Sequence, residues 1–311
     1  MTRCPVIWIP GPGNMRVPDF ILRCVGFLGD AYSGSDGIEF DANGTVFIVT
    51  IKSSFGGSYW YAVTAKHLVD DKPFQPTIAL NSAHRGERIL LDSILVGDER
   101  HWYFNPIDES ADIAVTPVMP VPGIDLLPIP CPMLLTPRKI EAHNIGIGDD
   151  VFFPGFFEKA PGRRKNTPIL RRGNLAMLPR EEIEIDLPDR NSEYRDVYLV
   201  ESHSIGGLSG SPVFVRETVH GRGKNTAGKT VPMYGVSGCE RSGFHLLGLN
   251  SGHFKVIVDR GVENAGIAYV TPSHKILEAL DHPELLRARI DNELALRDRR
   301  DQMHSSPDRG R

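Results

Sequence analysis

Seven prolines lie between residues 117 and 137 of this 311-residue chain. Proline lacks the backbone N–H that a β-ladder needs, so this stretch cannot form a central strand. On both sides of it, short runs of β-branched, aromatic and aliphatic residues alternate with turns that contain glycine or asparagine. The first two runs, residues 44–51 and 59–65, are separated by Gly56-Gly57 and predict a hairpin. The chain is therefore predicted to have two β-rich halves joined by a proline-rich linker.

Only the C-terminal end has a helical pattern. Thr271-Pro272 is typical of a helix start, and Ile276, Leu277 and Leu280 follow at helical spacing. With the many short strands, this predicts an all-β fold, a double antiparallel β-barrel followed by a C-terminal helix. The expected strands are 44–51, 59–65, 77–81, 88–96, 102–104, 113–117, 150–153, 183–185, 197–200, 212–215, 234–237, 245–250 and 266–270. The expected segments are an N-terminal arm (1–40), a first β-barrel (41–125), a Pro-rich linker (126–140), a second β-barrel (141–271), a C-terminal helical segment (272–299) and a disordered tail (300–311).

The charge balance argues against a nucleic-acid partner. Formal net charge is −4, with 24% charged and 41% hydrophobic residues, which is an ordinary globular composition. The basic run Arg163-Arg164-Lys165 is expected to be a solvated loop. No apolar run reaches the ~20 residues of a membrane helix, and the first residues do not have the pattern of a secretory signal. We therefore expect a cytoplasmic protein that binds neither nucleic acid nor membrane.

The cysteines do not predict a metal or redox site. Cys4, Cys24, Cys131 and Cys239 are far apart, and no pair has the C-x-x-C spacing of zinc or dithiol sites. Disulfides are not expected in a reducing compartment. No cofactor and no metal are therefore expected from the sequence.

The clearest chemical signal is Gly207-Leu208-Ser209-Gly210-Ser211-Pro212. Acyl transfer needs a nucleophile and backbone donors aimed at the developing oxyanion. Here Ser209 would be the nucleophile, and the N–H groups of Gly207 and Ser209 would form the oxyanion hole. The flanking glycines allow the chain to bend sharply without crowding the site. The alternative interpretation is a Gly/Ser turn between two strands.

Two further segments could supply the rest of a catalytic triad. His67 ends the apolar run Val63-Thr64-Ala65-Lys66, and a histidine is the side chain best suited to accept the serine proton near pH 7. Asp112 stands directly before Ile113-Ala114-Val115, where it could orient an imidazole. Taken alone, His67 could be a surface residue and Asp112 a residue that starts a strand.

Together, the three motifs resemble those of the trypsin-like (chymotrypsin-fold) serine peptidases. That family has Thr-Ala-x-His, Asp-Ile-Ala and Gly-x-Ser-Gly-x-Pro motifs in this order, with a second interval about twice the first. Here 45 residues separate His67 from Asp112, and 97 separate Asp112 from Ser209. The resemblance covers about residues 40–280 and implies two six-stranded antiparallel β-barrels. It also implies a serine endopeptidase that acts on a protein or peptide substrate, and a regulatory partner protein would be a plausible restraint.

The resemblance also implies substrate-binding residues. Leu247-Gly248-Leu249-Asn250-Ser251-Gly252 is similar to the family's strand that pairs with the substrate backbone. By this analogy Ser251 would lie beside Asp112, and Gly252 and His253 would face the substrate. His203 would sit near the floor of the specificity pocket. The ordinary alternative for both histidines is a place in a loop.

Several departures from the family pattern bear on the interpretation. The chain has no Ile-Val-Gly-Gly-like activation segment and no cysteine framework of the secreted members, which fits an intracellular, bacterial-type member. Lys66 replaces a small residue and would lower the pKa of His67 only if its side chain pointed inward. One alternative is a catalytically silent module of the same fold that binds peptides or a protein partner. A third interpretation, an α/β-hydrolase esterase, is disfavoured because its triad follows the order Ser, Asp, His and because helices between the strands are missing here.

Overall fold

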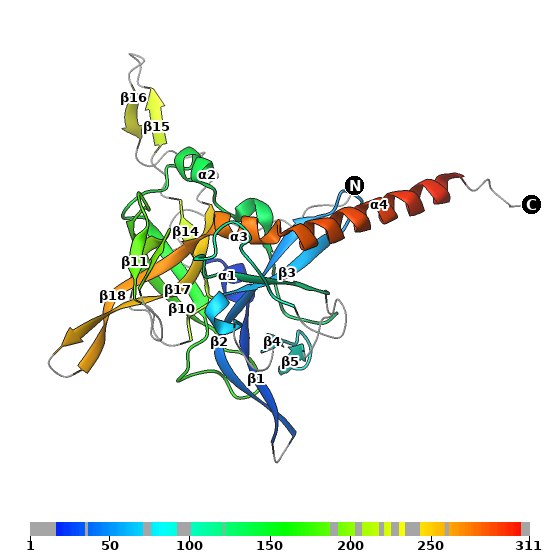
Figure 1. The fold of residues 1–311 in the computed structure, drawn as a ribbon, viewed down its shortest axis with the longest axis horizontal. Helices are drawn as coiled ribbons and strands as arrows, with labels where there is room; N and C mark the ends of the chain where they lie inside the picture. The colour runs from blue at the N-terminus through cyan, green and yellow to red at the C-terminus, as the bar shows by residue number, and fades with distance from the viewer. Residues whose placement is uncertain are drawn as a thin grey trace, which may run out of the picture.

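The protein consists of two β-structures packed side by side, with helices at the ends of the chain and between them (Figure 1). The computed structural model describes residues 17–34, 37–70, 76–91, 101–120, 122–186, 192–202, 207–217, 221–224, 230–233, 243–258 and 261–305. The first β-structure is an eight-stranded sheet in the order β5-β4-β1-β2-β3-β7-β6, with β8 parallel to β2. Its strands are β1 Val25–Gly34, β2 Gly37–Lys52, β3 Ser58–Thr64, β4 Thr77–Asn81, β5 Arg88–Leu91, β6 Tyr103–Phe104, β7 Ala114–Val118 and β8 Ile129–Pro130.

The second β-structure is a closed six-stranded barrel, as predicted for the C-terminal half. Its strands pair in the order β10-β13-β18-β17-β14-β9. They are β9 Asp150–Gly155, β10 Ile169–Met177, β13 Tyr198–Glu201, β14 Pro212–Arg216, β17 Phe244–Val258 and β18 Gly261–Pro272. Two small ribbons accompany the barrel: β11 Ile183–Ile185 with β12 Glu193–Arg195, and β15 Gly221–Lys224 with β16 Thr230–Met233. The predicted strand 234–237 lies outside the described residues.

The first half differs from the prediction of a second six-stranded barrel. Within the described part, its strand path runs from β5 to β6 without a pairing that joins these two end strands, so a second closed barrel is not confirmed. The sheet also begins earlier than expected, because β1 lies inside the predicted N-terminal arm. Phe27 and Leu28 of β1 are fully buried, which draws this segment into the sheet despite its glycines.

Each central strand buries both of its faces. In β2, Val46 and Ile48 belong to a core formed by residues of the first β-structure. Phe47 and Val49 belong to a second core, which the sheet shares with the barrel. In the barrel, Val213 and Val215 fill the interior, and Phe214 faces the shared core. Apolar residues therefore follow one another without alternation in these strands. The shared core fixes the two halves against each other.

The linker is more ordered than a simple connection. It contains β8, the 3-10 helix η2 Cys131–Met133 and the helix α2 Pro137–Ala142. The Thr136 side chain accepts a hydrogen bond from the backbone N–H of Lys139, and Pro137 occupies the first helical position, so α2 has a regular N-terminus. Prolines thus shape this segment without placing it in a central strand.

The other helices are α1 Asp19–Arg23, the 3-10 helix η1 Lys66–Leu68, α3 Ser273–Leu280 and α4 Pro283–Ser305. Figure 1 shows α4 extending away from the body of the molecule towards the C-terminus. It continues to Ser305, so the prediction of a disordered tail from residue 300 is wrong for 300–305; this stretch has no proline or glycine to end a helix. None of the described helices is both long and apolar enough to span a bilayer.

Candidate active site

A cleft of about 560 Å³ brings the three predicted catalytic residues into one place. His67 and Asp112 come from the first half of the chain, and Ser209 comes from the loop before β14 of the barrel. The cleft is lined by Lys66, His67, Asp70, Glu109, Asp112, Glu193, Arg195, Ser209, Ser251, Gly252, His253, Lys255 and Tyr269. Segments separated by more than a hundred residues therefore meet at the junction of the two β-structures.

Strand pairing explains why His67 and Asp112 are neighbours. β3 and β7 are antiparallel partners with Thr64 opposite Ala114, so the residues just beyond β3 and just before β7 meet at the same edge. His67 Nδ1 lies 2.8 Å from Asp112 Oδ2, and the His67 backbone N–H donates to Asp112 Oδ1 at 2.9 Å. Both oxygens of the Asp112 carboxylate are thus hydrogen-bonded to His67. The Asp112 side chain is 2% exposed and that of His67 is 46% exposed.

The Asp112 carboxyl stays ionised in spite of its burial. Burial by itself would raise its pKa, but the imidazole and backbone N–H of His67, together with the positive charge of Arg195, outweigh this effect. The pKa of Asp112 therefore lies below its ordinary value. The site accordingly holds a buried negative charge directly against the imidazole.

The Ser209 loop has a tightly bent backbone. Gly207 and Gly210 have φ angles of +94° and +81°, which favour glycine. A side chain at Gly207 would also overlap the ring of Phe156. The loop turns back on itself, because the Ser211 N–H donates to the Leu208 carbonyl at 3.0 Å. The glycines that flank Ser209 are therefore required by the shape of the loop.

Three successive carbonyls of this loop are held by residues of both β-structures. Thr45 Oγ1 donates to the Gly207 carbonyl at 3.0 Å, and the Thr45 N–H donates to the Ser209 carbonyl at 2.9 Å. Asn250 Nδ2 donates to the Leu208 carbonyl at 2.9 Å. In a trans peptide the C=O and the following N–H point in opposite directions. The Ser209 N–H therefore points away from the Asn250 side chain. The Gly207 N–H belongs to a peptide that begins at residue 206, outside the described residues.

Thr45 and Asn250 are structural supports that the sequence interpretation did not single out. Thr45 is fully buried in β2, and its hydroxyl oxygen also accepts the Phe156 N–H at 2.9 Å. Asn250 is 1% exposed and follows the apolar run 246–249 within β17. A hydrogen-bonding side chain within an otherwise apolar run was the available signal, because such a residue needs a partner in the core.

We predict that Thr45→Val lowers both stability and activity. The change keeps the shape of the side chain but leaves the Gly207 carbonyl and the Phe156 N–H without their partner, at a cost of about 1–3 kcal/mol for each buried group. The measurement is urea unfolding together with kcat on a peptide substrate. Thr77→Val in β4 is the control, because Thr77 is also buried but forms no hydrogen bond with residues 207–211. Equal effects of the two changes would contradict the supporting role of Thr45.

The predicted substrate-binding residues lie along β17. Ser251, Gly252 and His253 all line the cleft. The Ser251 hydroxyl bonds Thr271 Oγ1 at 2.6 Å, so its described partner is β18, although it shares the cleft with Asp112. Gly252 faces Tyr269, whose ring and hydroxyl occupy the space that a side chain would need. Burial and then the charge of Lys255 lower the pKa of the half-buried His253. His203 lies outside the described residues.

Two charged residues of the cleft bear on the sequence interpretation. Lys66 does line the cleft, but its ammonium donates to the Glu109 carbonyl at 3.2 Å and lies over the Phe104 ring. Arg195 was missed, because it belongs to the short, polar strand β12. Its guanidinium is paired with Glu193 at 2.8 Å and is only 13% exposed. Arg195 thus adds a fixed positive charge to the wall of the cleft.

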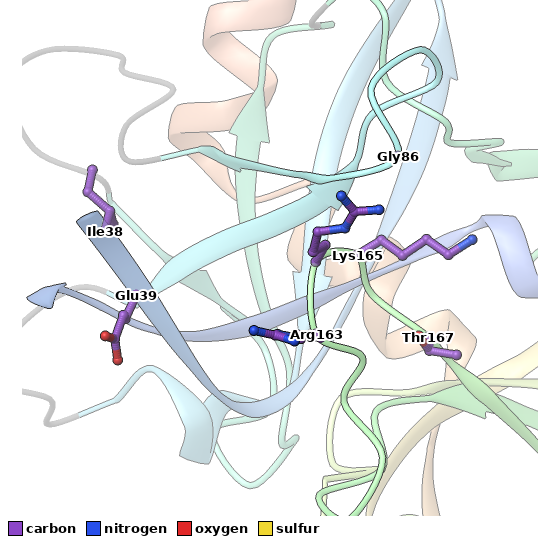
Figure 2. Close-up of a pocket in the computed structure, with 7 residues that line it drawn as sticks. Ile38, Glu39, Gly86, Arg163, Lys165 and Thr167 are labelled. Atoms are coloured by element: carbon purple, nitrogen blue, oxygen red, sulfur yellow. The ribbon is translucent and has the colours of Figure 1, made fainter. Parts of the chain in front are cut away.

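A larger hollow of about 1170 Å³ shares no lining residue with this cleft. It is lined by Ile38, Glu39, Gly86, Arg163, Arg164, Lys165 and Thr167. Figure 2 shows that the labelled side chains come from separate segments and point in different directions. The basic run 163–165 is exposed, as expected for a solvated loop. The hollow contains neither serine, cysteine nor histidine among its lining residues, and none of the three predicted catalytic residues lies in it.

Comparisons with known proteins give matches to solved structures alone. No family model matches the chain, and no curated protein matches it. The MamO protease domain from Magnetospirillum magneticum is similar at 13% identity and a TM-score of 0.47, over 83% of this chain and 96% of that one. The active form of the Rv3671c protease from M. tuberculosis is similar at 18% identity and a TM-score of 0.43, over 90% and 91%. Both are protease structures.

Proposed function

We propose that this protein is a trypsin-like serine endopeptidase with His67, Asp112 and Ser209 as its catalytic triad. The observation that carries the proposal is the double hydrogen bond of the buried Asp112 carboxylate to the ring and the backbone of His67, in the cleft that Ser209 also lines. A carboxylate that orients an imidazole beside a serine is the arrangement that activates a hydroxyl for acyl transfer.

The reaction would proceed through an acyl-enzyme. Ser209 Oγ attacks the carbonyl carbon of the peptide bond while His67 Nε2 accepts the hydroxyl proton. The carbonyl oxygen becomes an oxyanion that the N–H groups of Ser209 and Gly207 stabilise. His67 then gives the proton to the leaving amine as the C–N bond breaks. A water molecule, deprotonated by the same imidazole, hydrolyses the ester and restores Ser209.

The open edge of β17 supports an extended peptide as substrate. The β14–β17 ladder ends at the pair Pro212–Leu249, and one further pair of backbone bonds joins Asn250 to the Ser209 loop. From Ser251 onward, the described residues pair β17 only with β18 on its other side. A substrate strand could therefore add to this edge through main-chain hydrogen bonds, beside Ser209.

A fluorophosphonate probe tests the proposal directly. We expect the wild-type protein to be labelled on Ser209 and to hydrolyse a peptide library, and Ser209→Ala to lose labelling and at least about 1000-fold in kcat. Ser211→Ala is the matched control, because Ser211 lies two residues away but is fully buried, with no hydrogen-bond partner for its hydroxyl among the described residues. Hydrolysis that survives Ser209→Ala would refute the mechanism. Peptide binding without labelling would instead identify a silent binding module.

A further inference from the structure

His143, Glu217 and His245 form a second cluster of chemically competent side chains, away from the cleft. None of the three lines the cleft that contains Ser209. They come from three separate segments: His143 ends α2, Glu217 follows β14, and His245 lies in β17. Their spacing along the chain has no motif, so the sequence could not have predicted the cluster.

Backbone hydrogen bonds fix the three segments relative to one another. Val215 of β14 pairs with His245 of β17, and the Glu217 N–H donates to the Gly243 carbonyl at 3.0 Å. The segment that leads to α2 is tied to β17 by the Leu135 N–H, which donates to the Leu246 carbonyl at 3.1 Å. The cluster therefore stands on rigid elements, as a preformed ligand site does.

The side chains converge on one small volume. Glu217 Oε1 lies 3.6 Å from His143 Nδ1, and Glu217 Oε2 lies 3.4 Å from His245 Nε2. The two imidazole rings are 4.3 Å apart between centroids. One ligand atom from each residue can be chosen so that all lie within 4.8 Å of one another, and all three residues are partly buried. Two ligands at about 2.0–2.1 Å from a tetrahedral Zn²⁺ are separated by roughly 3.3 Å, so small side-chain rotations would close the site.

The neighbouring cations do not compete for Glu217. The Lys139 ammonium donates to the carbonyls of Pro132 and Leu134, and Arg216 is paired with Asp150. Among the described residues, Glu217 forms ion pairs with the two histidines and with no lysine or arginine. Two closely spaced imidazoles that share one carboxylate form the nitrogen-and-oxygen donor set that suits zinc.

We propose that His143, Glu217 and His245 bind a divalent transition-metal ion, with Zn²⁺ as the best fit and water as a fourth ligand. Glu217 and Gly243 flank residues 218–242, the segment that connects β14 to β17. The metal would link the C-terminal end of α2 to the two strands β14 and β17 where this connecting segment begins and ends. The site shares no residue with the cleft that contains the triad, so the ion has no part in the proposed peptide hydrolysis.

The test is Zn²⁺ binding to the chelator-treated full-length protein, measured by isothermal titration and by the shift in Tm. We expect one ion per chain with a Kd below about 10 μM, and a Tm that rises with the Zn²⁺ concentration. Glu217→Gln and His245→Ala should each weaken binding at least about tenfold. His84→Ala, which removes an exposed histidine elsewhere, should bind as tightly as the wild type.

The Glu217→Gln variant keeps the size and shape of the side chain but removes its negative charge and one acceptor oxygen, so it separates metal binding from folding. A wild-type Kd weaker than about 0.1 mM would overturn the proposal. So would equal Zn²⁺ affinity in the wild type and in the Glu217→Gln variant, since the ion would then be bound elsewhere. Co²⁺ provides an independent readout, because its visible absorption should show a coordination number of four or five that the variant loses.

Discussion

Asp112→Asn should lower kcat for peptide hydrolysis by about 10⁴-fold while leaving the fold intact. The reason lies in the two hydrogen bonds that His67 makes with this side chain. The backbone N–H of His67 can only donate, so the amide oxygen of the new side chain must face it. The amide NH₂ group then faces Nδ1 and forces Nδ1 to accept. The proton of the neutral ring must move to Nε2, which can no longer take the proton of Ser209.

Asp108→Asn is the matched control for this change. Asp108 is also an ion-paired carboxylate, bonded to Ser110 and to Lys275, but it does not line the cleft. We expect its kcat to stay within a few-fold of the wild type. A loss smaller than about tenfold for Asp112→Asn would mean that His67 is not oriented by Asp112 during the reaction.

Asp112→Asn should also change how stability depends on pH in acid. Because the pKa of Asp112 is lowered in the folded protein, its contribution to the free energy of unfolding is present above the unfolded pKa of about 3.9. It is lost as the pH falls through the folded pKa. The wild type should therefore lose stability more steeply below about pH 4 than Asp112→Asn does. Parallel curves from urea unfolding across this range would contradict the lowered pKa.

Gly210→Ala should destabilise the protein by about 2–5 kcal/mol and abolish peptidase activity. The φ angle of +81° costs a residue with a Cβ about 1–2 kcal/mol. The added Cβ would also overlap the carbonyl oxygen of Thr45 and the hydroxyl of Thr64. That carbonyl belongs to a central strand and cannot move aside, and overpacking of this kind costs about 1–3 kcal/mol. Urea unfolding and kcat measure the two effects.

Gly57→Ala separates the backbone cost from the steric cost. Gly57 has a nearly equal φ angle of +77°, but an added Cβ would have nothing within 4 Å. We expect a loss of only about 1–2 kcal/mol and an unchanged kcat. If Gly57→Ala and Gly210→Ala were equally destabilising, contact with Thr45 would not be what requires glycine after the nucleophile.

The features that could be predicted from the sequence are those with strong local patterns. Ser209 and its flanking glycines, the apolar run before His67 and the strand after Asp112 each have such a pattern, and the structure places all three residues in one cleft. Most barrel strands were also predicted, because they are short apolar runs bounded by turns. The catalytic roles themselves stay predictions until the variants are measured.

The features that were missed depend on contacts between distant segments. β10 contains Arg171-Arg172-Gly173 and has no apolar run, and pairing with β9 and β13 makes it a strand. β1 was assigned to an irregular arm for a similar reason. Thr45 acts on the Ser209 loop and Arg195 acts on Asp112, and nothing near either residue in the sequence shows these distant contacts. Local propensity is overridden in these cases by tertiary pairing.

The hydrogen bonds from Thr45 to the Ser209 loop have a consequence for how the active protein is formed during synthesis. Thr45 precedes Ser209 by 164 residues, so a growing polypeptide contains β2 before it contains the loop that β2 holds. A fragment that starts after the linker would contain every barrel strand but would lack Thr45, and so the support for the Ser209 loop. Peptidase activity would therefore arise only after the first sheet and the barrel have packed against each other.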